Sequence, residues 1–326
     1  MKHPRRLWND FKDRTLLLGL FDFTHFGYHL QARKWRPLDI CLSDRTVVVT
    51  GATSGLGKAA AIRLAALGAR VVLVGRDSAK LQQTHSELSE QRDGKNVVCF
   101  RADLSLMSEV RRLARELAEA EPDLHVLVHN AGALFNERGT TAEGLEQTFA
   151  LDLASPFLLT NLLLPKLKES APARIVNVSS GGMYTQRIRV DDLQFQKGRY
   201  NGAVAYARAK RGLVILTEMW AEKLRGTGVT VNAMHPGWAD TPGVVSSLPG
   251  FYKVTRRVLR SPAEGADTMV WLAAAPEAAQ ITGLFWLDRQ PRLTHVFPGT
   301  RESPEERVVL WSELCRLSGW REGDAP

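Results

Sequence analysis

The chain has 326 residues, of which 44% are hydrophobic and 24% are charged, and these proportions are typical of a soluble globular protein rather than a disordered chain. A net charge of +8 would suit an acidic partner, but the basic residues are scattered and no aromatic stacking motif accompanies them, so no nucleic-acid binding is expected. Cys41, Cys99 and Cys315 are widely spaced, which indicates a reducing compartment and no disulfide framework.

Residues 1–44 form a basic, aromatic-rich extension that we expect to be helical. Its apolar run at 16–21 is far short of the roughly 20 residues that span a bilayer, and nothing argues for export, so we expect a cytoplasmic protein. The extension either leans on a membrane surface or a partner chain, or packs on its own domain. His25 and His29 are four residues apart, but no third ligand is apparent, so we predict no metal site.

The globular domain begins with a strand, a glycine-rich turn and a helix. Residues 44–50, with three consecutive valines, predict a buried parallel strand, and an alanine-rich helix follows the turn. Gly51 permits a tight turn, while Gly55 and Gly57 allow the backbone to approach a pyrophosphate at the start of the helix. This arrangement predicts a dinucleotide-binding site.

The second strand, at 69–74, ends in residues that bear on the choice of cofactor. At this distance beyond the glycine-rich turn an acidic residue would bind the ribose hydroxyls of NAD, whereas an arginine accommodates the 2′-phosphate of NADP. Gly75 occupies the position of the acidic residue and Arg76 follows it, so NADP is favoured. Asp77, the next residue, could still bind the ribose hydroxyls, so NAD is the alternative cofactor.

The alternation of strands and helices continues and predicts one α/β domain, 45–298, with a lid at about 238–260 and a helical tail at 299–326 that lies on the surface or joins an oligomer contact. The further strands are expected at 96–100, 124–130, 173–179, 229–234 and 283–287, and the further helices at 78–92, 107–120, 145–164, 203–224, 262–275 and 305–317.

Tyr206 and Lys210 carry the clearest candidate chemistry. Two side chains four residues apart on a helix share one face, and a fixed positive charge lowers the pKa of a nearby phenol toward the range of a general acid or base. A lone Tyr-x-x-x-Lys is equally typical of an ordinary amphipathic helix, so its significance depends on the other motifs.

Those motifs follow a characteristic order, with Thr-Gly-x-x-x-Gly-x-Gly at 50–57, Asn-Ala-Gly at 130–132, Ser-Ser at 179–180, Tyr-x-x-x-Lys at 206–210 and Pro-Gly at 236–237. In this they resemble the short-chain dehydrogenase/reductase superfamily, and residues 179–183, 235–244 and 265–273 are similar to its member 12 group. The resemblance implies a Rossmann fold, that is, a doubly wound parallel sheet with the site at the carboxyl ends of the strands.

The resemblance also implies hydride transfer between NADP(H) and a small-molecule carbonyl or secondary alcohol, in a chain that can form homo-oligomers. Tyr206 would pass the proton, Lys210 would lower its pKa and bind the ribose, and Ser180, with Ser179 as the second choice, would hold the reacting oxygen. The residues implied to bind the cofactor are Gly51, Thr53, Ser54, Gly55, Leu56, Gly57, Arg76, Asp103, Leu104, Asn130, Ala131, Gly132, Tyr206, Lys210, Pro236, Gly237 and Thr241. Asp103 is equally expected to cap the next helix.

One position departs from the family pattern. Asp152 stands where the family usually has an asparagine that helps to hold a water linking the catalytic lysine to solvent. An aspartate accepts the same hydrogen bonds but adds a charge near Lys210, so the proton relay is expected to change or activity to be low. Pro156, in the same predicted helix, 145–164, could also kink it. The alternative function is a cofactor-binding protein with little turnover that acts as an interaction or sensor module.

Overall fold

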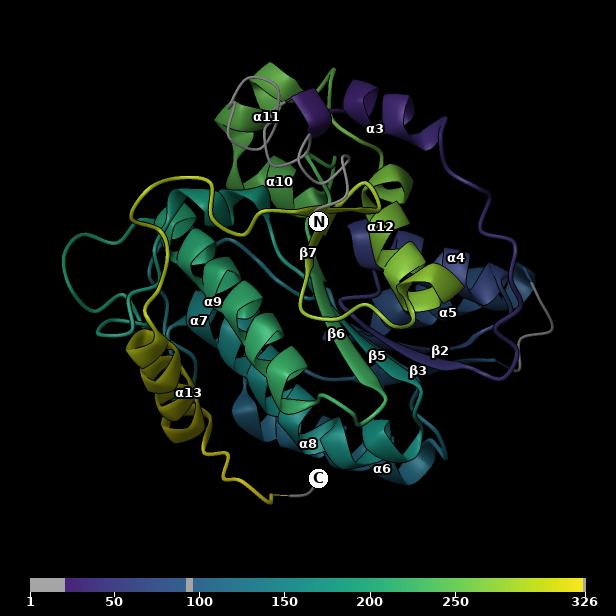
Figure 1. Ribbon diagram of the computed structural model, residues 1–326, viewed down its shortest axis with the longest axis horizontal. Helices are drawn as coiled ribbons and strands as arrows, with labels where there is room; N and C mark the ends of the chain where they lie inside the picture. Colours follow the sequence, from purple (N-terminus) through teal and green to yellow (C-terminus); the bar gives the residue numbers. More distant parts are fainter. Residues whose placement is uncertain (1–20, 92–95, 325–326) are drawn as a thin grey trace.

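An eight-stranded sheet forms the centre of the part of the chain that the computed structural model describes, residues 21–91 and 96–324 (Figure 1). Its strands are β1 Thr46–Thr50, β2 Arg70–Gly75, β3 Val97–Arg101, β4 Val126–His129, β5 Ala173–Val178, β6 Val229–Met234, β7 Phe285–Leu287 and β8 Gln290–Arg292. The spatial order is β3-β2-β1-β4-β5-β6-β7-β8, and all neighbours pair in parallel except β7 and β8. The predicted doubly wound sheet is confirmed, and its topological switch lies between β1 and β4.

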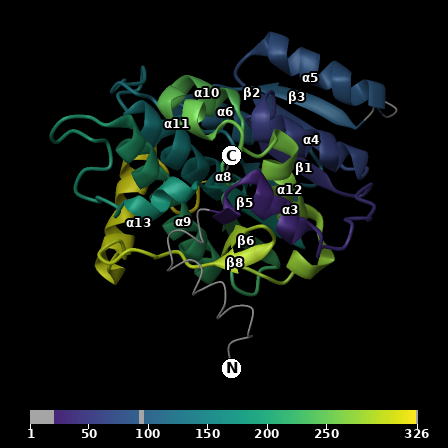
Figure 2. The same cartoon turned by 90° about the horizontal axis from the view of Figure 1, so that it is seen from above.

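Helices cover both faces of the sheet. They are α3 His25–Ala32, α4 Gly55–Ala66, α5 Ser78–Gln91, α6 Met107–Ala120, α7 Gln147–Phe149, α8 Ser155–Glu169, α9 Gly202–Lys223, α10 Pro242–Ser247, α11 Pro249–Thr255, α12 Pro262–Ala274 and α13 Pro304–Ser318. Consecutive strand residues face opposite sides, so Val48 packs with α6, α8 and α9, whereas Val47 and Val49 pack with α4 and α12. Figure 2 shows α9 and α13 on one side and α4 and α5 on the other.

The helix expected at 145–164 is divided by a π-helical turn, Ala150–Ala154, which follows α7 and leads into α8. Pro156 does not kink the helix, because it lies in the first turn of α8, where a missing N–H is tolerated. The combined segment Gln147–Glu169 is long and apolar enough to span a membrane, but 83% of its apolar window is buried inside the protein. Its apolar character therefore serves the core, and the π turn is what distorts the helix around Asp152.

Part of the N-terminal extension packs on the domain, although most of the apolar run at 16–21 lies outside the described residues. Backbone hydrogen bonds join His25 to Val258 and Phe23 to Trp238, so this segment contacts both ends of the predicted lid, 238–260. The lid itself contains two short helices, α10 and α11, which lie near α3 at one end of the molecule (Figure 1).

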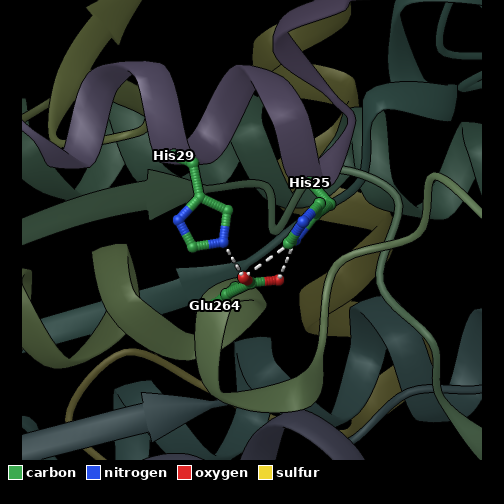
Figure 3. A group of neighbouring side chains, drawn as sticks. All are labelled: His25, His29 and Glu264. Atoms are coloured by element: carbon green, nitrogen blue, oxygen red, sulfur yellow. Dashed lines mark hydrogen bonds and ion pairs between the residues drawn. The ribbon is translucent and has the colours of Figure 1, made fainter.

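His25 and His29 have a third neighbouring group after all, and on this point the tertiary structure corrects the prediction from sequence. Glu264, in the first turn of α12, contacts both imidazoles, as Figure 3 shows. Glu264 is 239 residues from His25 in sequence, so no spacing rule could have associated them.

The C-terminal tail also contributes to the core. Leu310 and Leu314 of α13 are fully buried, and the ring of Trp311 meets that of Phe157 in α8 at a centroid distance of 5.0 Å. The tail is therefore more than a charged surface helix, because one side of α13 completes the packing of α8 and α9.

Candidate active site

The glycine-rich turn after β1 is packed too closely for larger residues. Gly51 and Gly55 have φ values of +64° and +51°, which L side chains rarely adopt. A Cβ at Gly57 would lie 2.3 Å from the Gly51 carbonyl oxygen, so the start of α4 presses directly on the turn. The Asn130 amide donates to the carbonyls of Thr50 (2.9 Å) and Gly51 (3.2 Å), which ties the end of β4 to the turn.

This turn fits a pyrophosphate. Ser54 precedes α4 in an extended conformation and its side chain does not cap the helix, so the N–H groups of the first turn of α4 stay available for an anion. Thr53 lies beside Gly75 at the end of β2, toward the expected adenosine position. The side chain of Leu56 packs against Gly265 in α12, so only its backbone N–H, in the first turn of α4, is placed to contact an anion.

Two residues after β2 have separate roles. Arg76 is exposed directly after the strand. The Asp77 carboxylate accepts hydrogen bonds from the N–H groups of Ala79 (3.0 Å) and Lys80 (3.1 Å) at the start of α5. Asp77 is thus engaged in capping a helix, which removes the main argument for a ribose-binding acid. Sequence reasoning missed Arg101, which pairs with Gly75 in the sheet register and donates to the Arg76 carbonyl. Its signal was its position at the end of the adjacent strand.

Asp103, at the end of the third strand, does not cap the next helix as one alternative expected. Its carboxylate accepts from the N–H (3.0 Å) and the hydroxyl (2.7 Å) of Ser105, which forms a local turn. The carboxylate of Glu143 instead accepts from the first N–H groups of α6, including that of Ser108 at 2.9 Å. Leu104 is buried beneath this turn.

Ser180, Tyr206 and Lys210 converge where β5 ends against α9. The Lys210 ammonium lies 5.5 Å from the centre of the Tyr206 ring, and the Ser180 hydroxyl is close enough to the phenol to lower its pKa. The buried Ser179 hydroxyl donates to the Lys210 carbonyl at 2.9 Å, so it holds α9 on the sheet. Ser180, which is only partly buried, is therefore the serine that remains beside the reacting groups.

Asp152 forms a direct ion pair with Lys210. The separation of Asp152 Oδ1 from Lys210 Nζ is 2.8 Å, and the two side chains are 0% and 4% exposed. Asp152 Oδ2 accepts the Ala133 N–H at 3.2 Å, and Lys210 also donates to the Val178 carbonyl at 3.1 Å. A Cβ at Gly132 would lie 2.3 Å from Asp152 Oδ1 and 2.8 Å from Lys210 Nζ, so only glycine leaves room for the pair.

The environment raises the pKa of Tyr206, contrary to the sequence-based expectation. Burial is the main cause and the negative charge of Asp152 adds to it, whereas Lys210 and Ser180 act in the opposite direction. Burial alone would lower the pKa of Lys210, but Asp152 and Tyr206 raise it above its usual value, so the ammonium stays protonated. Burial raises the pKa of Asp152, and Lys210 opposes this. The resting site thus contains a neutral phenol beside a charged lysine.

The segment after β6 closes the other end of the site. Gly237 has a φ of +73°, and a Cβ there would lie 2.5 Å from Arg260 Nε. Thr241 caps α10 through its hydroxyl, and its methyl group lies beside Gly55 of the glycine-rich turn. The Ser247 hydroxyl donates to the Leu134 carbonyl at 2.8 Å, so the lid reaches across to the loop after β4.

The aromatic residues of the long loop before α9 serve packing. The Tyr184 hydroxyl donates to the Leu293 carbonyl at 2.9 Å. The rings of Phe195 and Tyr200 lie 5.1 Å apart, and the Tyr200 hydroxyl donates to Glu146 at 3.0 Å. These contacts stabilise the loop that leads to Tyr206.

Comparisons with known proteins agree with this geometry. A sequence model described as short chain dehydrogenase matches residues 45–249. The chain is 39% identical to dehydrogenase/reductase SDR family member 12 of Bos taurus over 91% of this chain and 95% of that protein. It is 36% identical to retinol dehydrogenase 12 of Homo sapiens over 94% of this chain and 98% of that protein. A solved Pseudomonas aeruginosa RhlG/NADP active-site complex superposes with a TM-score of 0.63 at 28% identity, covering 77% of this chain and 96% of that one.

Proposed function

The chain belongs to the short-chain dehydrogenase family, as its motifs indicated, and on that premise we propose that it transfers hydride between NADP(H) and the carbonyl or secondary alcohol of a small molecule. The observation that carries this proposal is the convergence of Ser180, Tyr206 and Lys210 at the end of β5, above the buried Asp152–Lys210 pair. A nicotinamide bound beside these residues would supply or accept the hydride.

The three side chains have distinct roles. The Ser180 hydroxyl holds the carbonyl oxygen, and the Tyr206 phenol donates its proton to that oxygen as the carbon gains hydride. The ammonium of Lys210 stabilises the resulting phenolate and retains one N–H beyond those directed at Asp152 and Val178, which suits a ribose hydroxyl. Burial keeps the phenol protonated, as a general acid requires. We propose carbonyl reduction as the working direction, because a largely reduced NADP pool would drive the reaction that way.

We propose NADP rather than NAD as the cofactor. Arg76 is exposed at the end of β2, Arg101 lies next to it in the sheet, and Asp77 is engaged with α5. Two guanidinium groups at the adenosine end would bind a 2′-phosphate, while the Asp77 carboxylate is already hydrogen-bonded to α5. The similar Pseudomonas aeruginosa RhlG structure is a complex with NADP, which supports this choice.

The test combines binding with turnover. Fluorescence titration should show NADPH binding at least tenfold more tightly than NADH, which corresponds to about 1.4 kcal/mol. Arg76→Glu should remove that preference, and equal losses for both cofactors would contradict the assignment of Arg76.

The second arm uses a panel of carbonyl substrates. Tyr206→Phe should bind NADPH normally and lose about 10²- to 10⁴-fold in turnover, the usual contribution of a general acid. Tyr200→Phe removes a hydroxyl that bonds Glu146 instead and serves as the matched control. Turnover that survives in Tyr206→Phe would refute the mechanism, and failure of the wild-type chain to bind either cofactor would support a non-enzymatic module instead.

We also propose a cytoplasmic location with peripheral membrane contact through α3. Phe26 and Leu30 are 56% and 48% exposed on this helix, and the basic residues Arg33 and Lys34 follow it directly. Exposed apolar side chains beside basic ones suit the surface of an anionic bilayer.

A further inference from the structure

Two histidines of α3 and a glutamate of α12 form a cluster that includes none of the catalytic residues (Figure 3). His29 Nε2 lies 2.7 Å from Glu264 Oε1, and His25 Nδ1 lies 3.0 Å from the same oxygen. The three ligand atoms all lie within 4.8 Å of one another. We propose that His25, His29 and Glu264 bind one divalent transition-metal ion, zinc by ligand chemistry, which joins α3 to α12.

The donor set suits this class of ion. Two imidazole nitrogens and one carboxylate oxygen are ligands that zinc accepts at about 2.0–2.2 Å, with water completing a tetrahedron. Such bonds place neighbouring donors about 3.3–3.5 Å apart, so each histidine nitrogen would move only a few tenths of an ångström away from Glu264 Oε1. The two histidine nitrogens lie within 4.8 Å of each other and would adjust to the same spacing. The histidines can make this adjustment and admit water, since their side chains are 39% and 54% exposed.

Both supporting elements hold the ligands in position before any ion arrives. His25 and His29 are four residues apart and so project from one face of α3, whose first turn is capped by Thr24. Glu264 Oε2 accepts the Ser261 N–H at 2.8 Å, as part of a capping box that fixes the carboxylate at the start of α12.

The charge at the cluster also suits a cation. Glu264 places a carboxylate oxygen within 3.0 Å of a nitrogen of each imidazole, so an acidic ligand lies at the centre of the cluster. The nearby guanidinium of Arg289 is paired with Asp267 at 2.7 Å, which neutralises a charge that would otherwise repel the ion.

The position gives the ion a structural consequence. Glu264 follows the predicted lid by four residues, and the segment around α3 bonds to the lid at Trp238 and Val258. An ion bound here would fasten α3 to the end of the lid without touching Ser180, Tyr206 or Lys210. Metal binding at this cluster is therefore separate from hydride transfer and can fail independently of it.

The test is a titration of the untagged, chelator-treated full chain with Co²⁺, whose visible absorption reports the number and type of ligands. We expect one ion per chain, displaced by Zn²⁺ but not by an equal concentration of Mg²⁺, which prefers oxygen ligands. His29→Gln and Glu264→Gln should each weaken binding at least tenfold.

The controls separate metal binding from folding. Glutamine preserves the capping box, so Glu264→Gln should retain the wild-type circular dichroism spectrum. His85 lies on α5 and hydrogen-bonds the Val97 carbonyl of β3, away from the cluster, so His85→Gln should bind cobalt as the wild type does. Absence of a cobalt spectrum in the wild type, or an unchanged spectrum in the His29→Gln/Glu264→Gln double variant, would overturn the proposal and leave a hydrogen-bonded clamp only.

Discussion

The buried ion pair between Asp152 and Lys210 yields the sharpest prediction, because water cannot solvate either charge if its partner is removed. Asp152→Ala leaves the Lys210 ammonium buried without its carboxylate, and breaking such a pair costs about 3–5 kcal/mol of unfolding free energy. Asp152→Asn keeps an oxygen that can accept from Lys210, and a hydrogen bond to a charged group contributes about 1.5–3 kcal/mol. We therefore expect a loss of only about 2 kcal/mol for the asparagine variant.

The pH dependence tests the origin of this loss. Because the folded-state pKa of Lys210 is raised above 10.5, the pair stabilises the protein fully below pH 10.5, and this contribution disappears as the pH rises through the folded pKa. The gap between wild type and Asp152→Ala in urea unfolding should thus be large at pH 7 and shrink above pH 10.5. Asp39→Asn, an exposed control, should change stability by less than about 0.5 kcal/mol.

Activity gives a second measurement of the same pair. Asp152 contributes to the raised pKa of Tyr206, so removing its charge should lower that pKa and move the alkaline limb of the reduction profile to lower pH. Asp152→Ala stability within about 0.5 kcal/mol of wild type, or a limb that moves to higher pH, would refute the reasoning.

Three further outcomes are expected. Burial and the charge of Lys210 lower the pKa of His129 to about 3, so the fold keeps this histidine neutral and its stability falls as the pH drops from 6.5 toward 3. The free energy of unfolding in urea should therefore be several kcal/mol lower at pH 4 than at pH 7, and His129→Gln should reduce this difference. Gly132→Ala should abolish turnover by displacing the buried pair, whereas Gly250→Ala, where a Cβ meets nothing within 4 Å, should retain it. Phe26→Asp should reduce pelleting with anionic vesicles, and equal pelleting would remove α3 from the membrane contact.

The order of the parallel strands and of the helices between them followed from the sequence alone, because runs such as Val47 to Val49, followed by a glycine turn, are typical of strands buried in a parallel sheet. The family motifs then placed Ser180, Tyr206 and Lys210 at strand ends or on one helical face, and the structure brings them together. The sequence therefore predicted the features that local residue patterns determine, namely the main strands and helices and the positions of the motif residues on them.

Only the tertiary structure decided the properties that depend on distant neighbours. The π turn that brings Asp152 directly onto Lys210 leaves no periodic signature, and the sign of the Tyr206 pKa shift depends on burial that several elements create together. Asp77 and Arg76 are adjacent in sequence, yet the start of α5 engages one and leaves the other exposed. Glu264 meets His25 across 239 residues, because chain folding, not spacing, brings α12 beneath α3.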